Sequence, residues 1–207
     1  MQLKILKYNS VKSTNEEAIK LIKKNKTKPK IIISKNQTKG KGTMGKKWIS
    51  KKGNFFATIL FELTSKNIKP EEISILNSFL IRDVLKKYTK YKIKVKWPND
   101  LLINSRKLCG ILQEVIESNS KKYLIVGIGI NTVYAPKSSQ FKSISLSQCS
   151  NKKIDNKSIL NDLKRSYEKL ISDIKEYKLD HLKKIFEINE LLSRRHRKYT
   201  YKNYITR

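Results

Sequence analysis

A glycine-rich segment lies between two apolar runs typical of β-strands, and it constrains the fold more than any other feature. Residues 37–48 read QTKGKGTMGKKW, with KIIISK before them at 30–35 and NFFATILFEL after them at 54–63. GKGTMG fits the pattern G-x-G-x-x-G, but a dinucleotide-binding fingerprint places these glycines between a strand and the start of a helix. The residues from 46 to 51 have no helical periodicity. The segment therefore predicts a loop that joins two strands.

The glycine loop of a protein kinase also joins two strands, so this topology alone leaves a kinase possible. The chain contains neither H-R-D nor D-F-G, and His196 lies in the sequence RRHRKY. A plain turn is a further alternative, because glycine is common wherever a chain reverses direction. The remaining motifs have to decide between these readings.

Hydrophobic periodicity predicts one main domain of alternating helices and strands. Strands are expected at 3–7, 30–35, 54–63, 92–97, 107–116 and 121–131, with a hairpin arm at 100–106, and helices at 14–25, 71–87, from 156 onward and at 182–192. This pattern predicts an α+β fold, a mixed β-sheet with helices packed on one face. We expect a catalytic domain over 1–150, C-terminal helices over 151–192 and a short basic tail over 193–207.

The chain is strongly basic, but its charge alone names no partner. It has 207 residues, of which 47 are Lys or Arg and 17 are Asp or Glu, for a formal net charge of +30. Only seven of the basic residues are arginine, whereas base and phosphate recognition relies heavily on arginine forks. We interpret the charge as a solvated lysine coat and expect no specific nucleic-acid partner. A basic nucleic-acid-binding module stays as the alternative from another class.

Cysteine content and hydrophobicity predict a reduced, cytoplasmic protein. Cys109 and Cys149 are too few for a disulfide framework and lack C-x-x-C spacing. The N-terminal MQLKILKY has no apolar run long enough for a signal peptide, and nowhere do about 18 apolar residues occur in a row. We therefore expect no membrane association.

Five short blocks decide what kind of site the glycine segment belongs to. They are STN at 13–15, QTKGKGTMGKKW at 37–48, VKWPND at 95–100, RKLCGIL at 106–112 and GIGIN at 127–131. In this order they resemble the catalytic domain of biotin-protein ligases, over about residues 8–135. Each block alone is weak, but their joint occurrence is specific.

The resemblance implies a class II synthetase-like biotin/lipoate ligase fold and a two-step reaction. Biotin is activated by ATP with Mg²⁺ to biotinyl-5′-AMP, and the biotinyl group then passes to a lysine of a biotin carboxyl carrier protein, such as an acetyl-CoA carboxylase subunit. A lipoate or octanoate transferase shares the fold and also uses a lysine. The KWPND and STN blocks argue against that rival.

Two catalytic residues follow from the resemblance. The carboxylate of biotin must approach a polyanionic triphosphate, and like charges at about 4 Å in an effective dielectric near 20 repel by about 4 kcal/mol. Lys107, before Leu-x-Gly-Ile, matches the family's catalytic lysine and is the candidate ammonium that offsets this cost. Asp100 is the candidate that assists deprotonation of the acceptor lysine, whose pKa is about 10.4. A structural Asp100 that caps a turn is the alternative, and the metal ligands stay unassigned.

Binding residues are also carried over from the resemblance. A ureido group needs acceptors for two N–H groups and donors for one carbonyl. The expected biotin-binding residues are Ser13, Thr14, Asn15, Gln37, Lys41, Gly42, Thr43 and Trp48. The expected ATP- or adenylate-binding residues are Gly40, Gly42, Gly45, Asn99, Lys107 and Asn131. Ser13 could instead cap a helix, through a capping box with Glu16, and Trp48 could be a core residue.

The chain departs from the family pattern in three places. GKGTMGK stands where relatives often have GRGRRGR, so Thr43 occupies an arginine position. We expect no N-terminal winged helix, as in the ligase-only class, and a C-terminal SH3-like domain that is absent or truncated. The sequence leaves open whether the protein is a monomer or a homodimer.

Overall fold

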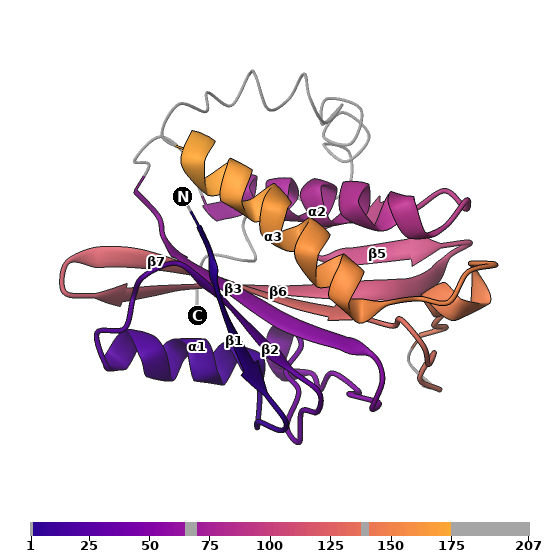
Figure 1. Cartoon of the computed structure of the whole chain (residues 1–207), viewed down its shortest axis with the longest axis horizontal. Coiled ribbons are helices and arrows are strands. Elements are labelled where there is room, and N and C mark those ends of the chain that lie inside the picture. The colour runs from indigo at the N-terminus through magenta and orange to yellow at the C-terminus, as the bar shows by residue number, and fades with distance from the viewer. Residues whose placement is uncertain (1, 65–69, 138–140, 175–207) are drawn as a thin grey trace.

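A mixed, seven-stranded sheet forms the centre of the computed structural model, which describes residues 2–64, 70–137 and 141–174. The strand order is β1-β2-β3-β7-β6-β5-β4 (Figure 1). The strands are β1 (Lys4–Tyr8), β2 (Lys30–Ser34), β3 (Phe55–Glu62), β4 (Lys94–Lys96), β5 (Asp100–Ile103), β6 (Arg106–Ser118) and β7 (Lys121–Ile130). The β1–β2 pair is parallel and the other neighbouring pairs are antiparallel. The expected mixed sheet is confirmed.

Helices cover both faces of this sheet, so the expectation of helices on one face is correct only in part. Helices α2 (Pro70–Leu85) and α3 (Asn156–Asp173) lie on one face, and α1 (Thr14–Lys23) lies on the other (Figure 1). The reason is that the central strands are apolar on both sides. Ile31 of β2 packs into the core with α2 and α3, whereas the next residue, Ile32, packs with residues of α1.

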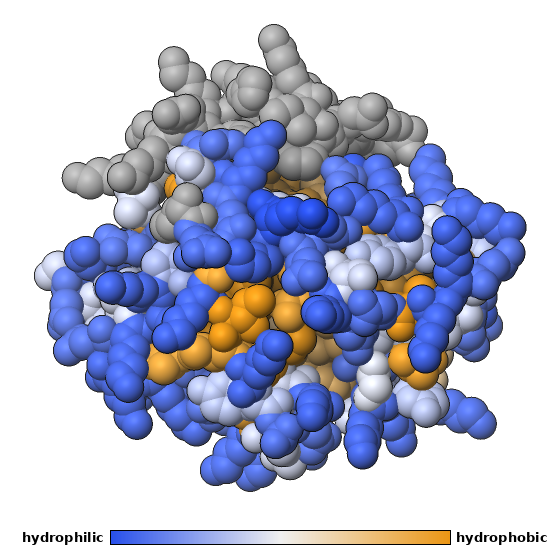
Figure 2. Space-filling view, in the orientation of Figure 1, coloured by the Kyte–Doolittle hydropathy of each residue, from blue (hydrophilic) through white to orange (hydrophobic). Residues whose placement is uncertain are grey.

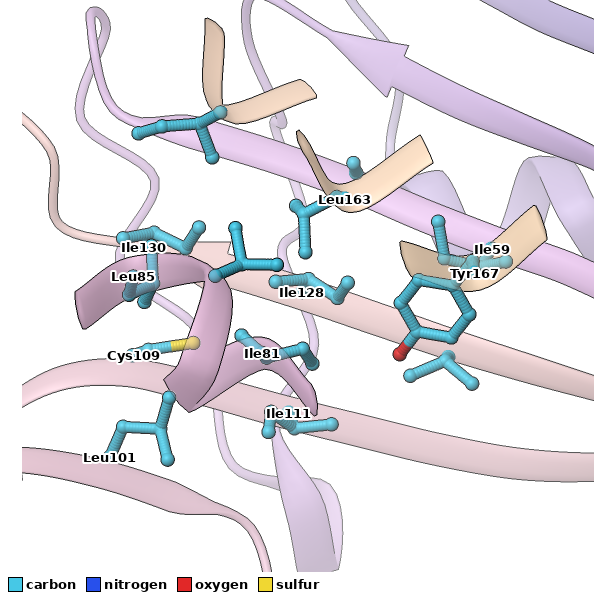
Figure 3. Close-up of a cluster of buried hydrophobic side chains, with 14 of the residues drawn as sticks. Ile59, Ile81, Leu85, Leu101, Cys109, Ile111, Ile128, Ile130, Leu163 and Tyr167 are labelled. Atoms are coloured by element: carbon cyan, nitrogen blue, oxygen red, sulfur yellow. The ribbon is translucent and has the colours of Figure 1, made fainter. Parts of the chain in front are cut away.

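The larger core lies between the sheet and the α2–α3 layer (Figure 3). Tyr167 of α3 is fully buried there, and its hydroxyl donates a hydrogen bond to Asn77 Oδ1 at 2.9 Å. The Asn77 amide in turn donates to Gln113 Oε1 at 2.6 Å. These bonds satisfy the buried polar groups that join α3, α2 and β6.

Several predicted boundaries change in the structure. The predicted helix at 14–25 ends at Lys23, the helix at 71–87 ends at Leu85 and continues as a 3₁₀ turn, and the strand at 92–97 shortens to Lys94–Lys96. The helix predicted at 182–192 and the tail at 193–207 lie outside the described residues. Hydrophilic side chains cover most of the face in Figure 2 and surround an apolar area at its centre. Within the described ranges, no helix has the length and apolar character needed to cross a bilayer.

Candidate active site

The glycine segment folds back on itself between β2 and β3, as the strand-to-strand prediction requires. Lys41 and Lys47 pair as an isolated antiparallel bridge, and the Trp48 amide donates to the Gly40 carbonyl at 2.9 Å. A Cβ at Gly40 would lie 2.6 Å from that same chain at the Trp48 carbonyl oxygen, so only glycine allows the close approach. The tip, Thr43–Gly45, is a 3₁₀ turn. No helix starts here, so this loop cannot hold a pyrophosphate in the dinucleotide-binding manner.

Glycines on two adjacent strands form a floor on the α1 face of the sheet. Gly110 of β6 and Gly129 of β7 are register partners. The Trp48 ring lies directly on them, since an added Cβ would approach it to 2.6 Å at Gly110 and to 2.5 Å at Gly129. Trp48 is half-buried, and its Nε1 is buried without a hydrogen-bond partner among the described residues. The Trp48 ring therefore covers the floor, and its expected role as a wall beside a bound ligand stays a prediction.

Asn15 lies beside Trp48 on the same floor, against Gly127, and is held by three groups. Its Nδ2 donates to Glu114 Oε2 at 2.6 Å and to the Leu112 carbonyl at 3.3 Å. Its Oδ1 accepts from the Thr58 hydroxyl at 2.7 Å. The side chain is 3% exposed. Its orientation is therefore fixed by strands β3 and β6.

Thr14 and Gln37 join the start of α1 to the start of the glycine segment. Gln37 Oε1 accepts from the Thr14 backbone N–H at 2.8 Å and lies 3.1 Å from the Thr14 hydroxyl, and Gln37 Nε2 donates to Ser50 Oγ at 3.1 Å. Ser13 occupies the N-cap position and is buried, but its side chain makes no capping hydrogen bond. The predicted capping box is therefore wrong, and the Glu16 side chain that would close it pairs with Lys41 instead.

Lys107, at the start of β6, forms the charged centre of the site. Its ammonium lies 2.7 Å from Asp100 Oδ1, and each of the two side chains is 18% exposed. The same ammonium lies 5.4 Å from the centre of the Trp48 ring and 5.3 Å from the centre of the Phe141 ring. Asp100 starts β5 and its carboxylate pairs with this lysine, and its catalytic role stays a prediction. The aromatic faces add cation–π attraction that holds the ammonium in place.

Asn99 and Asn131 complete the polar surroundings of Lys107. Asn99 Nδ2 donates to Thr43 Oγ1 at 3.3 Å, which ties the KWPND block to the glycine loop. Asn131 is 1% exposed, and its Nδ2 donates to the Lys107 carbonyl at 3.1 Å. Its Oδ1 is buried and has no hydrogen-bond partner in the described part of the chain. Among the described residues, the site thus includes a buried donor on Trp48 and a buried acceptor on Asn131 that have no hydrogen-bond partner.

Lys41 forms an ion pair with a glutamate of α1, and Cys109 is packed in the core. The Lys41 ammonium lies 2.9 Å from Glu16 Oε1 of α1, and the hydrogen bond it donates lowers the Glu16 pKa below its ordinary value. Cys109 is fully buried, and this burial raises its pKa far above the ordinary thiol value. The predicted burial of Cys109 in the core is therefore confirmed, and the raised pKa disfavours the thiolate that a nucleophile needs.

Sequence reasoning missed several parts of the site, of which only the glycines lie within the five blocks. They are Thr58, Glu114, Phe141 and the floor glycines Gly110, Gly127 and Gly129. Glycines two residues apart in GIGIN, on a strand, were the one available signal, because such residues share a face of the sheet. Nothing local marks Thr58 or Glu114 as partners of Asn15.

Comparisons with known proteins agree with this geometry. Residues 8–131 match the model of the biotin/lipoate A/B protein ligase family. The chain is 27% identical over 189 residues to the "Bifunctional ligase/repressor BirA" of Bacillus subtilis, covering 88% of this chain and 58% of that protein. It is 29% identical over 127 residues to the biotin–[acetyl-CoA-carboxylase] ligase of Paracoccus denitrificans, covering 60% of this chain and 52% of that one. It therefore spans somewhat more than half the length of these relatives.

A solved structure has a similar fold. The biotin protein ligase from Aquifex aeolicus, in complex with biotin and ATP, superposes with a TM-score of 0.74 at 26% identity. The match covers 88% of this chain and 76% of that one.

Proposed function

Because the chain belongs to the biotin/lipoate A/B protein ligase family, we propose that it activates biotin with ATP and transfers the biotinyl group to a lysine of a carrier protein. The observation that carries the proposal is the Lys107–Asp100 pair, 2.7 Å apart, beside two buried polar atoms without partners, Trp48 Nε1 and Asn131 Oδ1. Unpaired buried polar atoms are costly, and a polar ligand would satisfy them.

In the first step a biotin carboxylate oxygen attacks the α-phosphorus of ATP, and the bond to pyrophosphate breaks. Lys107 is positioned by Asp100 and by two aromatic rings, so its charge can stabilise negative charge that grows on the α-phosphoryl oxygens. Mg²⁺, when bound to the triphosphate, neutralises part of its charge, and the Asp100 carboxylate offers the type of oxygen ligand that Mg²⁺ prefers. No general base is required, because the attacking carboxylate is already ionised.

The head group of biotin would be held on the glycine floor. Thr14, Asn15 and Gln37 supply the hydroxyl and amide groups that a ureido ring needs, and Ser13 lies buried beside them. Trp48 would pack along the ligand, and the backbone N–H groups of the glycine segment would contact the phosphate. The segment residues with this role are Gly40, Lys41, Gly42, Thr43 and Gly45, and Asn99 and Asn131 would face the nucleotide.

In the second step the acceptor lysine of the carrier attacks the mixed anhydride, and AMP leaves. That lysine must lose a proton first, and Asp100 is the carboxylate of the site that can assist. The carrier is a biotin carboxyl carrier protein of a biotin-dependent carboxylase. We place the protein in the cytoplasm, which is supported by its two free, buried cysteines.

Biotin-dependent exchange between ATP and pyrophosphate tests this function without knowledge of the carrier. We expect exchange that requires both biotin and Mg²⁺. No exchange above background in the presence of both would refute the proposal. Exchange supported by lipoate but not by biotin would favour the lipoate transferase instead.

A further inference from the structure

Glu114 is a half-buried carboxylate on β6 that neither motif nor family match assigns. We infer that it is a positioning residue, which fixes the side-chain amide of Asn15 so that the Asn15 carbonyl oxygen accepts a hydrogen bond from a cyclic urea N–H. The inference rests on the proposed function and deepens it, because it names the group that sets selectivity for the urea.

The strand pairing brings Glu114 to Asn15. Gly110 and Glu114 lie on one face of β6, the face that carries Trp48 and α1, because residues two apart on a strand share a face. The register partner of Glu114 is Ile125, which packs with residues of α1. Glu114 Oε2 is therefore aimed at the first turn of α1, where it meets Asn15 Nδ2 at 2.6 Å.

The hydrogen-bond donors and acceptors around the Asn15 side chain explain why its contact with Glu114 fixes which way the amide points. The Asn15 amide has two N–H donors, and both have acceptors on β6, at Glu114 Oε2 and the Leu112 carbonyl. Its carbonyl oxygen has two lone pairs, and one accepts from the Thr58 hydroxyl. One acceptor position is left. An ionised carboxylate and a backbone carbonyl can only accept, so they forbid the flipped amide, whereas the Thr58 hydroxyl tolerates either orientation.

The hydrogen bonds of Gln37 and Thr14, which neighbour Asn15, also leave an acceptor rather than a donor for a ligand. Gln37 Oε1 faces both the backbone N–H and the hydroxyl of Thr14. The Thr14 hydroxyl also lies 2.8 Å from the Thr58 hydroxyl, whose one proton goes to Asn15 Oδ1, so the Thr14 proton goes to Thr58 Oγ1 or to Gln37 Oε1. In either case the Thr14 oxygen has acceptor capacity left. This hydrogen-bond network has Glu114, which only accepts, at one end. At the other end lies the Thr14 backbone N–H, which only donates. Between them they leave acceptors on Asn15 and Thr14, which suits a group with two N–H donors.

The place of the Asn15 oxygen agrees with this assignment. Of the atoms near a Cβ added at Gly127, Asn15 Oδ1 is the nearest. The carbonyl oxygen thus lies over the glycine floor, beside Trp48, while the amide nitrogen points to β6. A flipped amide would present N–H to the urea N–H and leave two donors facing each other.

A purely structural role for Glu114, as a tie between β6 and α1, would make a different prediction. In that case Glu114→Gln would weaken the binding of biotin and of all its analogues by the same factor. The test therefore compares Glu114→Gln with the wild-type chain by calorimetric binding of biotin and of two analogues, each methylated on one urea nitrogen. Glu114→Asp keeps a group that only accepts, and Glu117→Gln changes an exposed glutamate on the same strand as the matched control.

We expect Glu114→Gln to raise the Kd for biotin about 10-fold or more, because a charge-assisted hydrogen bond is lost and the amide is free to flip. The KM for ATP should stay within about 2-fold of the wild-type value, because a change that weakens only biotin binding leaves ATP binding unaffected. For one of the two analogues, the ratio of its Kd to that of biotin should fall in Glu114→Gln and stay near the wild-type ratio in Glu114→Asp and Glu117→Gln.

Unchanged ratios for both analogues in Glu114→Gln would overturn the inference, whether or not the Kd for biotin rises. If Glu114→Gln does not fold, Glu114→Ala takes its place, because it also removes the acceptor that forbids the flipped amide, and the same fall in one analogue-to-biotin ratio is expected. Failure of the proposed function looks different, because the wild-type chain itself would then neither bind biotin nor support pyrophosphate exchange.

Discussion

The ammonium of Lys107 and the carboxylate of Asp100 lie 2.7 Å apart at the starts of strands β6 and β5, which run antiparallel to each other. The pair combines a cation suited to the first step of the proposed reaction with a carboxylate suited to the second. A lysine held in this way needs little reorganisation when charge develops on phosphate.

Lys107→Ala should lower biotin-dependent pyrophosphate exchange by about 10² or more, which corresponds to roughly 3 kcal/mol of transition-state stabilisation. The matched control is Lys122→Ala, because Lys122 forms an ion pair at an exposed position, with its side chain 61% exposed. An exchange rate in Lys107→Ala equal to that of the control would assign the catalytic charge to another residue.

Gly129→Ala should disturb the ligand site while the fold stays intact. The new Cβ would lie 2.5 Å from Trp48 Cε2, so the indole has to move off the floor. Overpacking of this kind costs about 1–3 kcal/mol, and we expect a rise of about 5-fold or more in the KM for biotin. Gly45→Ala serves as comparison, because its Cβ would meet no atom within 4 Å, although its φ of +72° adds backbone strain. Equal effects of the two changes on KM would argue against Trp48 as a wall of the site.

Thr43→Arg should improve retention of the adenylate. The resemblance in sequence places Thr43 where an arginine is expected, and Thr43 lies beside Asn99, whereas Lys41 is already paired with Glu16. A charge-assisted hydrogen bond is worth about 1.5–3 kcal/mol, so its absence could shorten retention by roughly 10- to 150-fold. Released adenylate would biotinylate bystander proteins.

The measurement is biotin incorporation into an unrelated protein incubated with enzyme, biotin and ATP. Met44→Arg is the matched control, because it adds the same charge to a neighbouring side chain that is 80% exposed. We expect less bystander labelling with Thr43→Arg than with the natural sequence or Met44→Arg. Equal labelling by all three would mean that the loop retains its intermediate without the arginine.

Glu16→Gln should loosen the glycine loop in a pH-dependent way. The Lys41 ammonium holds the Glu16 pKa below its ordinary value of 4.5. A lowered folded pKa gives a stabilisation that is complete above the unfolded pKa and is lost as pH falls through the folded pKa. The pair is partly exposed, so we expect a difference of only about 0.2–1 kcal/mol between wild-type and variant in urea unfolding at pH 7.

That difference should shrink as the pH falls below about 4.5, where Glu16 becomes protonated. At neutral pH, trypsin should cleave the loop about 1.4- to 5-fold faster in the variant, which is the same free energy expressed as a population. Glu17→Gln, on the next residue of α1, controls for the loss of a helix charge. A stability difference that does not change with pH would show that the Glu16–Lys41 ion pair is not its source.

Hydrophobic patterns predicted most strands of the sheet, because each strand is one unbroken run of residues. NFFATILFEL and KKYLIVGIGI are apolar along most of their length, and they became β3 and β7 at the centre of the sheet. The same two-sided apolarity could have indicated that both faces need helices, since a strand covered on one face alternates. The prediction of a single helical layer overlooked this signal.

The site could be predicted as a set of motifs but not as a hydrogen-bond network. Asn15 meets Thr58 across 43 positions and Glu114 across 99 positions in the chain. Such contacts depend on strand order and register, which local patterns do not specify. Ser13 shows the converse, because a local capping rule failed where Glu16 pairs with Lys41, more than twenty positions away, instead of closing the capping box.

The two-sided sheet has a consequence for how this protein can change. In the proposed function, residues that face α1 select the ligand, whereas residues that face α2 and α3 supply most of the packing, with only the thickness of one sheet between them. Substitutions in the α2–α3 layer can therefore raise or lower thermal tolerance while substrate choice stays constant. The glycine floor allows little such freedom, because almost any side chain there would enter the space of Trp48 or Asn15. The molecule thus has one layer open to adaptation and one that the ligand constrains.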